Sequence, residues 1–299
     1  MKSVIETQQN LTWSLAIADF KELTKVRLAI SVVFSSIAGY FLGAYQIDVI
    51  SILLLAFGGY CMVGASNAYN QIIERDLDAL MRRTAHRPIP DGRMSVGTAL
   101  TIAVVMTLMG IVALYLLNPK TALFGALSIF LYTSVYTPLK TITPLSVFVG
   151  AIPGAIPFML GWVAATNEFG IEPGTLFMIQ FFWQFPHFWA LGWMLDEDYR
   201  KGGFKMLPTG KKDKGTALQI ILYTIWMLVI SVIPVFGVTG RLHLSPVAAV
   251  IVFIMGMGML IFAFKLYEKR DNQSARKLML ASVSYITLMQ LVYVIDKFI

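Results

Sequence analysis

A series of oxygen-bearing side chains stands where the second long apolar segment of the sequence becomes charged. Its members lie three or four residues apart: Asn67, Asn70, Glu74 and Asp78. At about 100° per residue, a continuous helix would present them within about 80° of one another on one face, and Asp76 on the opposite side. Carboxylate and amide oxygens suit Mg²⁺, which proteins usually hold through one or two carboxylates and substrate phosphates. The spacing therefore predicts a magnesium site at the membrane border, with the four aligned residues as catalytic candidates.

Basic side chains follow this series directly. The planar guanidinium group of arginine matches phosphate oxygens and commonly binds them. Carboxylates that can bind a metal thus stand beside arginines that can bind an anion. This combination predicts a site for a diphosphate group. A solvated loop with internal salt bridges is the alternative, although acids near a membrane span are costly and tend to be functional. The arginines concerned are Arg82, Arg83, Arg87 and Arg93.

A second cluster, again with acids before bases, ends the sixth apolar segment. Within that segment Gln180, Gln184 and His187 share one helical face. Asp198 joins them if the helix continues through Pro186, and His187 then lies ~16 Å deeper, near mid-membrane. There it could ligate a metal such as a porphyrin iron, or bond to a Gln or Tyr of another helix, and both readings stay open. The cluster comprises Asp196, Glu197, Asp198, Arg200, Lys201 and Lys205.

A third candidate stands at the end of the fourth apolar segment, where Tyr136 is followed four residues later by Lys140. Lys140 could neutralise a leaving diphosphate, and Tyr136 could bond to it. A lysine that extends along apolar surface to the membrane boundary is the alternative explanation.

The elements that must position these clusters are membrane helices. Of the 299 residues, 57% are hydrophobic and 14% are charged, and the mean hydropathy is +0.69. A soluble domain has about 25% charged residues, so this composition excludes an ordinary soluble enzyme, a disordered chain and a DNA-binding module. A single cysteine, Cys61, excludes a disulfide framework and a cysteine-based metal site.

Nine segments are apolar over about the 20 residues that a helix needs to cross a bilayer. We therefore predict an all-α integral membrane protein with nine transmembrane helices, in which 1–27 is an N-terminal tail and 28–299 a single domain. Pro153 and Pro157 predict a kink in the fifth helix. The predicted spans are 28–46, 49–73, 96–117, 121–137, 145–166, 174–195, 216–239, 246–267 and 277–296.

Basic residues indicate the orientation of these spans. If the N-terminus is cytoplasmic, 21 of the 24 Lys and Arg lie on the cytoplasmic side, and only Lys120, Arg241 and Lys297 lie on the other. By the positive-inside rule this asymmetry predicts a cytoplasmic N-terminus and an external C-terminus. It also accounts for the net charge of +7 without a nucleic-acid partner. The first 27 residues are polar and carry acids, unlike a signal or transit peptide.

The two acidic clusters suggest an internal duplication. Asp78 and Asp198 are 120 residues apart, about the length of four helices with their loops. This spacing predicts two four-helix units followed by a ninth helix. A unit with an even number of spans keeps its orientation when repeated, so both clusters face the cytoplasm. The working site is expected where the two halves meet.

The first cluster resembles the aspartate-rich signature of the intramembrane prenyltransferases of the UbiA superfamily. There N-x-x-x-E-x-x-x-D is followed by R-T-x-x-R-P, over residues 70–88. The segments P-G-A-I-P-x-x-x-G-W, W-Q-F-P-H-F-W and D-Y-x-x-x-G-F-x-M-L-P are similar to the branch of that superfamily that acts on haem. The similarity extends from about residue 20 to about residue 290. It departs from the family pattern after Lys140, where Thr141 replaces an expected arginine.

The resemblance implies a UbiA-like fold and a defined activity in a bacterial cell membrane. The farnesyl group of farnesyl diphosphate would be transferred to a vinyl group of haem b, which gives haem O for terminal oxidases. Haem A synthase or the assembly of an oxidase would follow as downstream partners. The resemblance implies Mg²⁺ as cofactor, bound by Asn70, Glu74, Asp78 and Asp198.

The resemblance also implies which residues bind the two substrates. His187 and Gln184 would contact the haem. Cationic and phenolic side chains would absorb the charge of the diphosphate, and these are Arg83, Arg87, Tyr136, Lys140 and Lys205.

Two other functions share part of this pattern. A prenyltransferase of the same superfamily with an aromatic or quinone-precursor acceptor would need the segment 67–93 but not His187. A secondary transporter would also carry polar side chains within its spans and an internal repeat. It would not need two carboxylate–arginine clusters on one face. A haem-binding assay would distinguish the prenyltransferase with another acceptor from our prediction. Ion-coupled uptake without diphosphate release would indicate the transporter instead.

Overall fold

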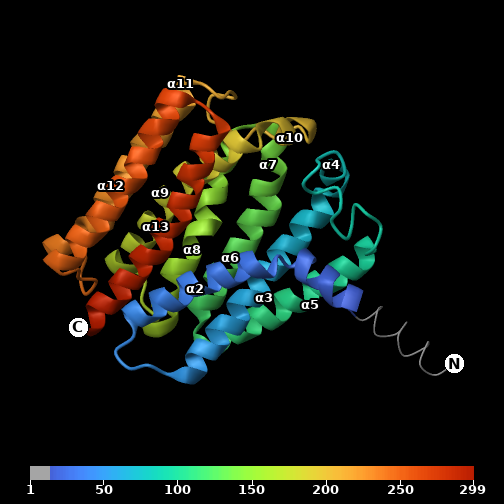
Figure 1. Ribbon diagram of the computed structural model, residues 1–299. Helices are drawn as coiled ribbons and strands as arrows, with labels where there is room; N and C mark the ends of the chain where they lie inside the picture. Colours follow the sequence, from blue (N-terminus) through green and yellow to red (C-terminus); the bar gives the residue numbers. More distant parts are fainter. Residues whose placement is uncertain (1–13) are drawn as a thin grey trace.

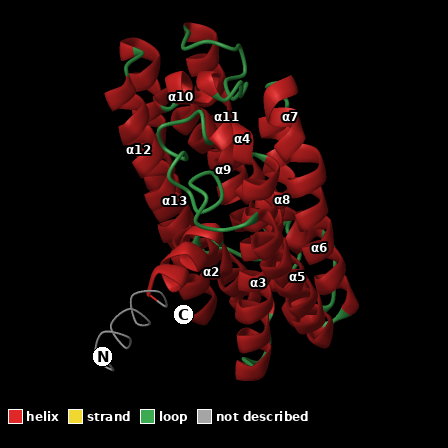
Figure 2. Cartoon of the chain, turned by 90° about the vertical axis from the view of Figure 1, so that its right-hand side faces the viewer, coloured by secondary structure: helices red, strands yellow, loops and turns green. Residues whose placement is uncertain are grey.

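The computed structural model describes residues 14–299, which form helices and connecting loops without a strand (Figure 2). The prediction of an all-α protein is therefore confirmed for this part of the chain. Of the predicted N-terminal tail, residues 1–13 lie outside the described residues, and 14–23 are helical. The elements that follow are α2 (Val26–Gly43), α3 (Val49–Ile73), α4 (Arg75–Asp78), α5 (Val96–Leu117), α6 (Pro119–Phe130), α7 (Thr137–Ile142), α8 (Ser146–Thr166), α9 (Ile171–Met194), α10 (Asp196–Lys201), α11 (Lys214–Val232), α12 (Pro246–Lys269) and α13 (Asn272–Phe298).

Eight helical segments of residues 14–299 are long and apolar enough to cross a membrane, so the chain has the character of a multi-pass membrane protein. One of them, Pro119–Ile142, joins α6 to α7 through a π-helical turn at Leu131–Tyr136. The remaining predicted span, 174–195, is the sixth along the chain and forms α9, which has 24 residues and packs against α8, α11 and α13. That α9 is also a membrane span stays a prediction.

Most of the long helices begin at residues whose side chains suit a helix start. The Asp48 carboxylate accepts the backbone N–H groups of Ile50 and Ser51 at the start of α3. The Asn118 amide oxygen accepts the N–H of Thr121 at the start of α6, where Pro119 takes the first position. Such caps satisfy donors that have no partner within the helix, which is why the apolar segments become helices at these residues.

Small residues allow the helices to approach closely. A Cβ atom at Gly39 of α2 would overlap the carbonyl oxygen of Phe158, and one at Gly161 of α8 would overlap the carbonyl oxygen of Ser36. Contacts between small residues hold membrane helices together because lipid supplies no hydrophobic driving force. The two prolines that were predicted to kink the fifth span do not end its helix. Helix α8 continues through Pro153 and Pro157, and α9 continues through Pro186.

The polar elements gather at one end of the helical bundle. Both views place α4, α7 and α10 at this end, while the C-terminal end of α13 lies at the opposite end (Figures 1 and 2). The two acidic clusters predicted from the sequence are on α4 and α10, or directly beside them. The fold therefore brings the two halves of the chain together at the end where the predicted site lies.

Candidate active site

A buried ion pair joins the first cluster to the fourth predicted span. The Nζ atom of Lys140 lies 2.8 Å from Oε1 of Glu74, and both side chains are about 90% or more buried. Glu74 is the C-terminal cap of α3, and Lys140 is on α7. The Lys140 ammonium also lies over two aromatic rings, 4.7 Å from the centre of Tyr136 and 5.4 Å from that of Phe204. Such contacts help to compensate a cation for its loss of water.

A second buried pair is formed within the first cluster. Nη1 of Arg87 lies 2.5 Å from Oδ2 of Asp78, whose side chain is 1% exposed. Burial raises the pKa of the Asp78 carboxyl, and the charge and hydrogen bond of Arg87 act against that rise. The other carboxylate oxygen, Oδ1, is buried without a hydrogen-bond partner. Because buried polar atoms are nearly always paired, an unpartnered carboxylate oxygen indicates a binding position for a cation.

The second cluster reaches the first through Asp198. Its carboxylate accepts the backbone N–H groups of Arg82 at 3.0 Å and of Arg83 at 3.2 Å. The guanidinium carbon of Arg83 lies 6.0 Å from the centre of the Tyr199 ring. Residues 116 positions apart in the chain thus form one polar layer. The two halves of the chain therefore meet at this contact, and that the working site lies here stays a prediction.

The two asparagines of the series donate hydrogen bonds from their side-chain amide groups to neighbouring segments. Nδ2 of Asn67 donates to the carbonyl oxygen of Thr24 at 3.2 Å. Nδ2 of Asn70 donates to the hydroxyl of Thr137 at 3.2 Å, which ties α3 to α7. Asn70 thus lies beside the Glu74–Lys140 pair, whereas Asn67 anchors the segment that precedes α2.

The predicted metal ligands fit a hard cation by chemistry but do not form a closed cluster. Among residues 14–299, no three carboxylate, histidine or cysteine side chains converge as metal ligands. Each acid is instead engaged by a donor: Glu74 by Lys140, Asp78 by Arg87, and Asp198 by the backbone. The free oxygen of Asp78 is the observation that favours a cation here, since oxygen donors suit Mg²⁺. Metal ligation by these residues stays a prediction.

The other predicted diphosphate ligands surround Lys140. The backbone N–H of Lys205 donates to the Lys140 carbonyl at 2.7 Å, and Nζ of Lys205 donates to the carbonyl of Ile142 at 3.1 Å. Tyr136 is buried against Gly150, where any Cβ would lie 2.6 Å from the phenol ring. A glycine is therefore needed at residue 150 to admit the tyrosine. Asp196 is outside this group, since its carboxylate pairs with Arg200 at 3.0 Å.

The charges of the site act on Lys25, which the sequence marks only as one basic residue before the first span. It precedes α2 in a left-handed conformation with φ of 48°. Burial, together with the charges of Arg87 and Lys140, lowers the pKa of Lys25 to about 7 against the attraction of Glu74. A cation held in a strained backbone conformation beside other cations is costly, and such strain concentrates at functional sites.

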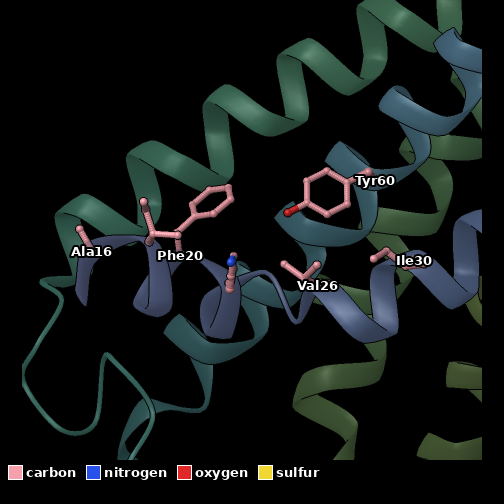
Figure 3. A pocket seen from close by; sticks show the side chains of 7 residues that line it. Ala16, Phe20, Val26, Ile30 and Tyr60 are labelled. Atoms are coloured by element: carbon pink, nitrogen blue, oxygen red, sulfur yellow. The ribbon is translucent and has the colours of Figure 1, made fainter. Parts of the chain in front are cut away.

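A hollow opens between the helix 14–23 and the helices α2 and α3. Figure 3 shows Phe20, Val26, Ile30 and Tyr60 directed toward it. Its lining is apolar apart from Lys21 and the hydroxyl of Tyr60, so this hollow offers a single cation, whereas the charged layer offers several.

The residues predicted to contact haem lie apart from the charged layer and are already engaged. Nδ1 of His187 shares a hydrogen bond of 2.9 Å with the hydroxyl of Ser282 on α13. Its ring stacks on Trp183 with 4.9 Å between the ring centres. Gln184 donates to the Ala151 carbonyl at 2.8 Å and lies against Gly154. The ring of His187 is thus bonded to another helix, as the second of its two readings expected, but the partner is Ser282 and not a Gln or Tyr.

Two helical alignments expected from the sequence are interrupted. Helix α3 ends at Ile73, and Glu74 has φ of −93° and ψ of 5° before the short α4 begins. Helix α9 ends at Met194, and Leu195 has φ of −101° before α10. The continuous helix assumed from Asn67 to Asp78 is interrupted at Glu74, and Asp78 is on the separate short helix α4. The condition stated for Asp198 is not met, since α9 continues through Pro186 but ends at Met194. Asp78 and Asp198 each reach the site after a turn, at Glu74 and at Leu195.

These features define an integral membrane enzyme site with buried acids and cations at one end of a helical bundle. The chain belongs to the UbiA prenyltransferase family, whose profile matches residues 32–288. A relative called protoheme IX farnesyltransferase, from Christiangramia forsetii, is 70% identical over 283 residues, which cover 95% of this chain and 94% of that protein.

Solved structures support the same fold. That of a digeranylgeranylglyceryl phosphate synthase superposes with a TM-score of 0.76 at 17% identity and covers 94% of this chain and 98% of its own. A UbiA homologue from Archaeoglobus fulgidus, bound to GPP and Mg²⁺, has a TM-score of 0.67 at 13% identity, covering 92% and 99%. The predicted UbiA-like fold is thereby confirmed.

Proposed function

We propose that this protein transfers the farnesyl group of farnesyl diphosphate to a vinyl group of haem b, which gives haem O and diphosphate. The observation that carries the proposal is the single charged layer in which Asp198 meets the Arg82–Arg83 backbone beside Asp78 and Glu74. Such a layer can hold a diphosphate at the border of the bilayer. The name of the 70% identical relative supports haem as the acceptor.

The charged layer would promote loss of the diphosphate. Mg²⁺, when bound, supplies positive charge at the leaving oxygens, and Asn70, Glu74, Asp78 and Asp198 would hold it. The Archaeoglobus homologue bound to GPP and Mg²⁺ supports the use of a divalent metal. As the bond between the allylic carbon and the diphosphate breaks, negative charge grows on the leaving group. Cations already in place stabilise that charge. They are Arg83, Arg87, Lys140 and Lys205, with Tyr136 beside them.

The acceptor half of the reaction takes place within the membrane. A bond forms between the allylic carbon of the farnesyl cation and the outer carbon of a haem vinyl group. Water then adds to the inner carbon and releases a proton, which leaves a hydroxyethylfarnesyl substituent. We assign the haem contact to His187 and Gln184, supported by the partial exposure of His187 on α9.

The charge distribution supports an orientation in a bacterial cell membrane. The end that carries α4, α7 and α10 would face the cytoplasm, since almost all Lys and Arg are predicted on that side. The N-terminus would then be cytoplasmic and the C-terminus external. A haem A synthase or the assembly of a terminal oxidase would take up the product.

The function is tested by incubating the detergent-solubilised protein with haem b, farnesyl diphosphate and Mg²⁺. We expect a haem adduct larger by one farnesyl group and one water in the mass spectrum, and its loss when EDTA removes the metal. Diphosphate release with a quinone precursor but not with haem would overturn the acceptor and keep the prenyltransferase. Ion-coupled uptake without diphosphate release would overturn both.

Lys25 gives the site a predicted pH dependence. Because its pKa is about 7 in the absence of an anion, a bound diphosphate favours the charged form and binding takes up a proton. Affinity for magnesium diphosphate should therefore fall as the pH rises from about 7 to about 9. The Lys25→Met variant should bind magnesium diphosphate about tenfold more weakly at pH 7, equivalent to about 1.4 kcal/mol. Its affinity should also lack the part of the pH dependence that Lys25 causes.

Calorimetric titration of the two proteins at several pH values measures the effect. The difference between them cancels the titration of diphosphate itself. If the unaltered protein and Lys25→Met have equal affinities for magnesium diphosphate and the same change of affinity with pH, Lys25 has no role in anion binding.

A further inference from the structure

A narrow apolar cavity lies in the N-terminal half of the bundle, below the charged layer. It is enclosed by α2, α3, α6 and α8, and its lining includes Val33, Gly59, Val63, Gly125 and Leu160. The cavity is small, with a volume of about 40 Å³, so it can take the end of a chain and not a whole one. The cavity contains no charged side chain, and nothing in the charge-neutralising chemistry of the site uses it.

The cavity continues the helical face that carries the predicted site. Gly59, Val63, Ser66 and Asn70 are spaced four, three and four residues apart on α3, so they lie on one face. From Asn70 to Gly59 the helix descends about 16 Å. The cavity therefore begins one turn below Asn70 and extends toward the middle of the membrane. A chain attached to a diphosphate in the charged layer would lie along this face.

The walls of the cavity suit a hydrocarbon. Its hydroxyl groups donate to carbonyl oxygens of helix backbones: Ser66 to Met62 at 2.9 Å, and Ser128 to Pro153 at 3.3 Å. Because these donors are satisfied, the cavity does not need water. Met62 also lines it, and the flexible thioether side chain of methionine can adapt when a ligand enters.

The deep end of the cavity is closed by Leu114 of α5, which is completely buried. A Cβ atom at Gly58 would lie 2.9 Å from this side chain, and one at Gly125 would lie 2.6 Å from it. Leu114 is therefore tightly wedged between α3 and α6. Gly59 differs from these glycines, because a Cβ there would meet only a methyl group of Val33, at 3.5 Å. Position 59 thus has room for a side chain, and that room is part of the cavity.

We propose that Gly59 sets the length of the prenyl chain that the enzyme accepts, with Leu114 as the floor of the cavity. This inference rests on the proposed function, since it assumes that a prenyl diphosphate binds with its head in the charged layer. A side chain at position 59 fills the space that the last isoprene unit of a farnesyl chain needs. A shorter geranyl chain ends above it.

The test compares Gly59→Leu with the matched variant Gly258→Leu. Gly258 lies in α12, and a Cβ there meets no atom within 4 Å. Both variants therefore add the same side chain to a membrane helix, but only one adds it to the cavity. Competition by geranyl and farnesyl diphosphate against a labelled prenyl diphosphate measures binding without any acceptor. For Gly59→Leu we expect the preference for farnesyl over geranyl to fall at least about tenfold, as steric exclusion from an apolar pocket commonly gives.

A second variant protects the test against a folding defect. Leu114→Ala removes the floor, and we expect it to improve the competition by geranylgeranyl diphosphate at least about threefold, well within the range that a few added methylene contacts give. Unchanged chain-length preferences in a folded Gly59→Leu protein would overturn the inference. If the unaltered protein binds farnesyl diphosphate but does not modify haem, only the proposed acceptor fails. If it binds no prenyl diphosphate, the proposed function fails together with the assumption made here.

Discussion

Replacing Glu74 with glutamine should lower the rate of prenyl transfer by about a thousandfold, the loss expected when one preorganised charge is removed from a site of charge stabilisation. The carboxylate of Glu74 lies at the end of α3 and faces Lys140. In our proposal it also binds the metal that stabilises the leaving diphosphate. Glutamine keeps the shape and one oxygen but loses the negative charge. Metal affinity and rate should therefore fall together.

The fold should tolerate this change. The amide oxygen of glutamine can still accept a hydrogen bond from the Lys140 ammonium, so the buried lysine keeps a partner. We expect Glu74→Gln to be inserted in the membrane and extracted as an intact protein. Diphosphate release and the mass of the haem product give the activity, and the midpoint of thermal unfolding in detergent gives the stability.

Asp76→Asn is the matched control. It also neutralises an acid of the first cluster, but the Asp76 side chain is 86% exposed and pairs only with Arg75 at 3.4 Å. We expect near-normal rates from it. Near-normal turnover by Glu74→Gln would remove Glu74 from the metal site and leave the Lys140 pair as a structural contact.

Much of the fold was predictable because each apolar segment is bounded by its own signal. Asp48 and Asn118 cap the starts of α3 and α6, and apolar runs of about 20 residues can only be helices in a bilayer, where every backbone group must be bonded internally. The predicted starts of the spans at residues 49 and 96 coincide with α3 and α5. Local sequence carries this information without any knowledge of tertiary contacts.

The arrangement of the site depended on contacts that local sequence does not carry. A helical periodicity identified Glu74 and Asp78 but could not show that α3 ends at Ile73 and that Asp78 is on the separate short helix α4. The partner of Asp198 is a pair of backbone N–H groups, and a backbone group has no signature in the sequence. Lys25 looks like any basic residue that precedes a span, and only the folded chain brings it near Arg87 and Lys140.

The pairing of Asp78 with Arg87 leads to the second large effect. The Arg87→Met variant would leave a carboxylate that is 1% exposed without its cation, while its other oxygen already lacks a partner. Removal of one member of a buried ion pair costs about 3–5 kcal/mol, because the remaining charge is buried and uncompensated. We expect a clearly lower unfolding midpoint and no measurable prenyl transfer. The exposed Arg75 is the control, and Arg75→Met should change stability little, as exposed pairs contribute little.

A double variant separates the stability of the pair from its function. In Asp78→Leu with Arg87→Met both charges are gone, and apolar side chains of similar volume can replace a buried pair with little loss or even a gain of stability. The unfolding midpoint should therefore recover, although activity should stay absent because an oxygen ligand and a diphosphate ligand are both missing. Recovery of stability without activity would show that the pair is kept for the reaction. Stability that falls further in the double variant than in Arg87→Met would mean that the pair holds the loop 79–95 on the bundle, and that its loss of activity is indirect.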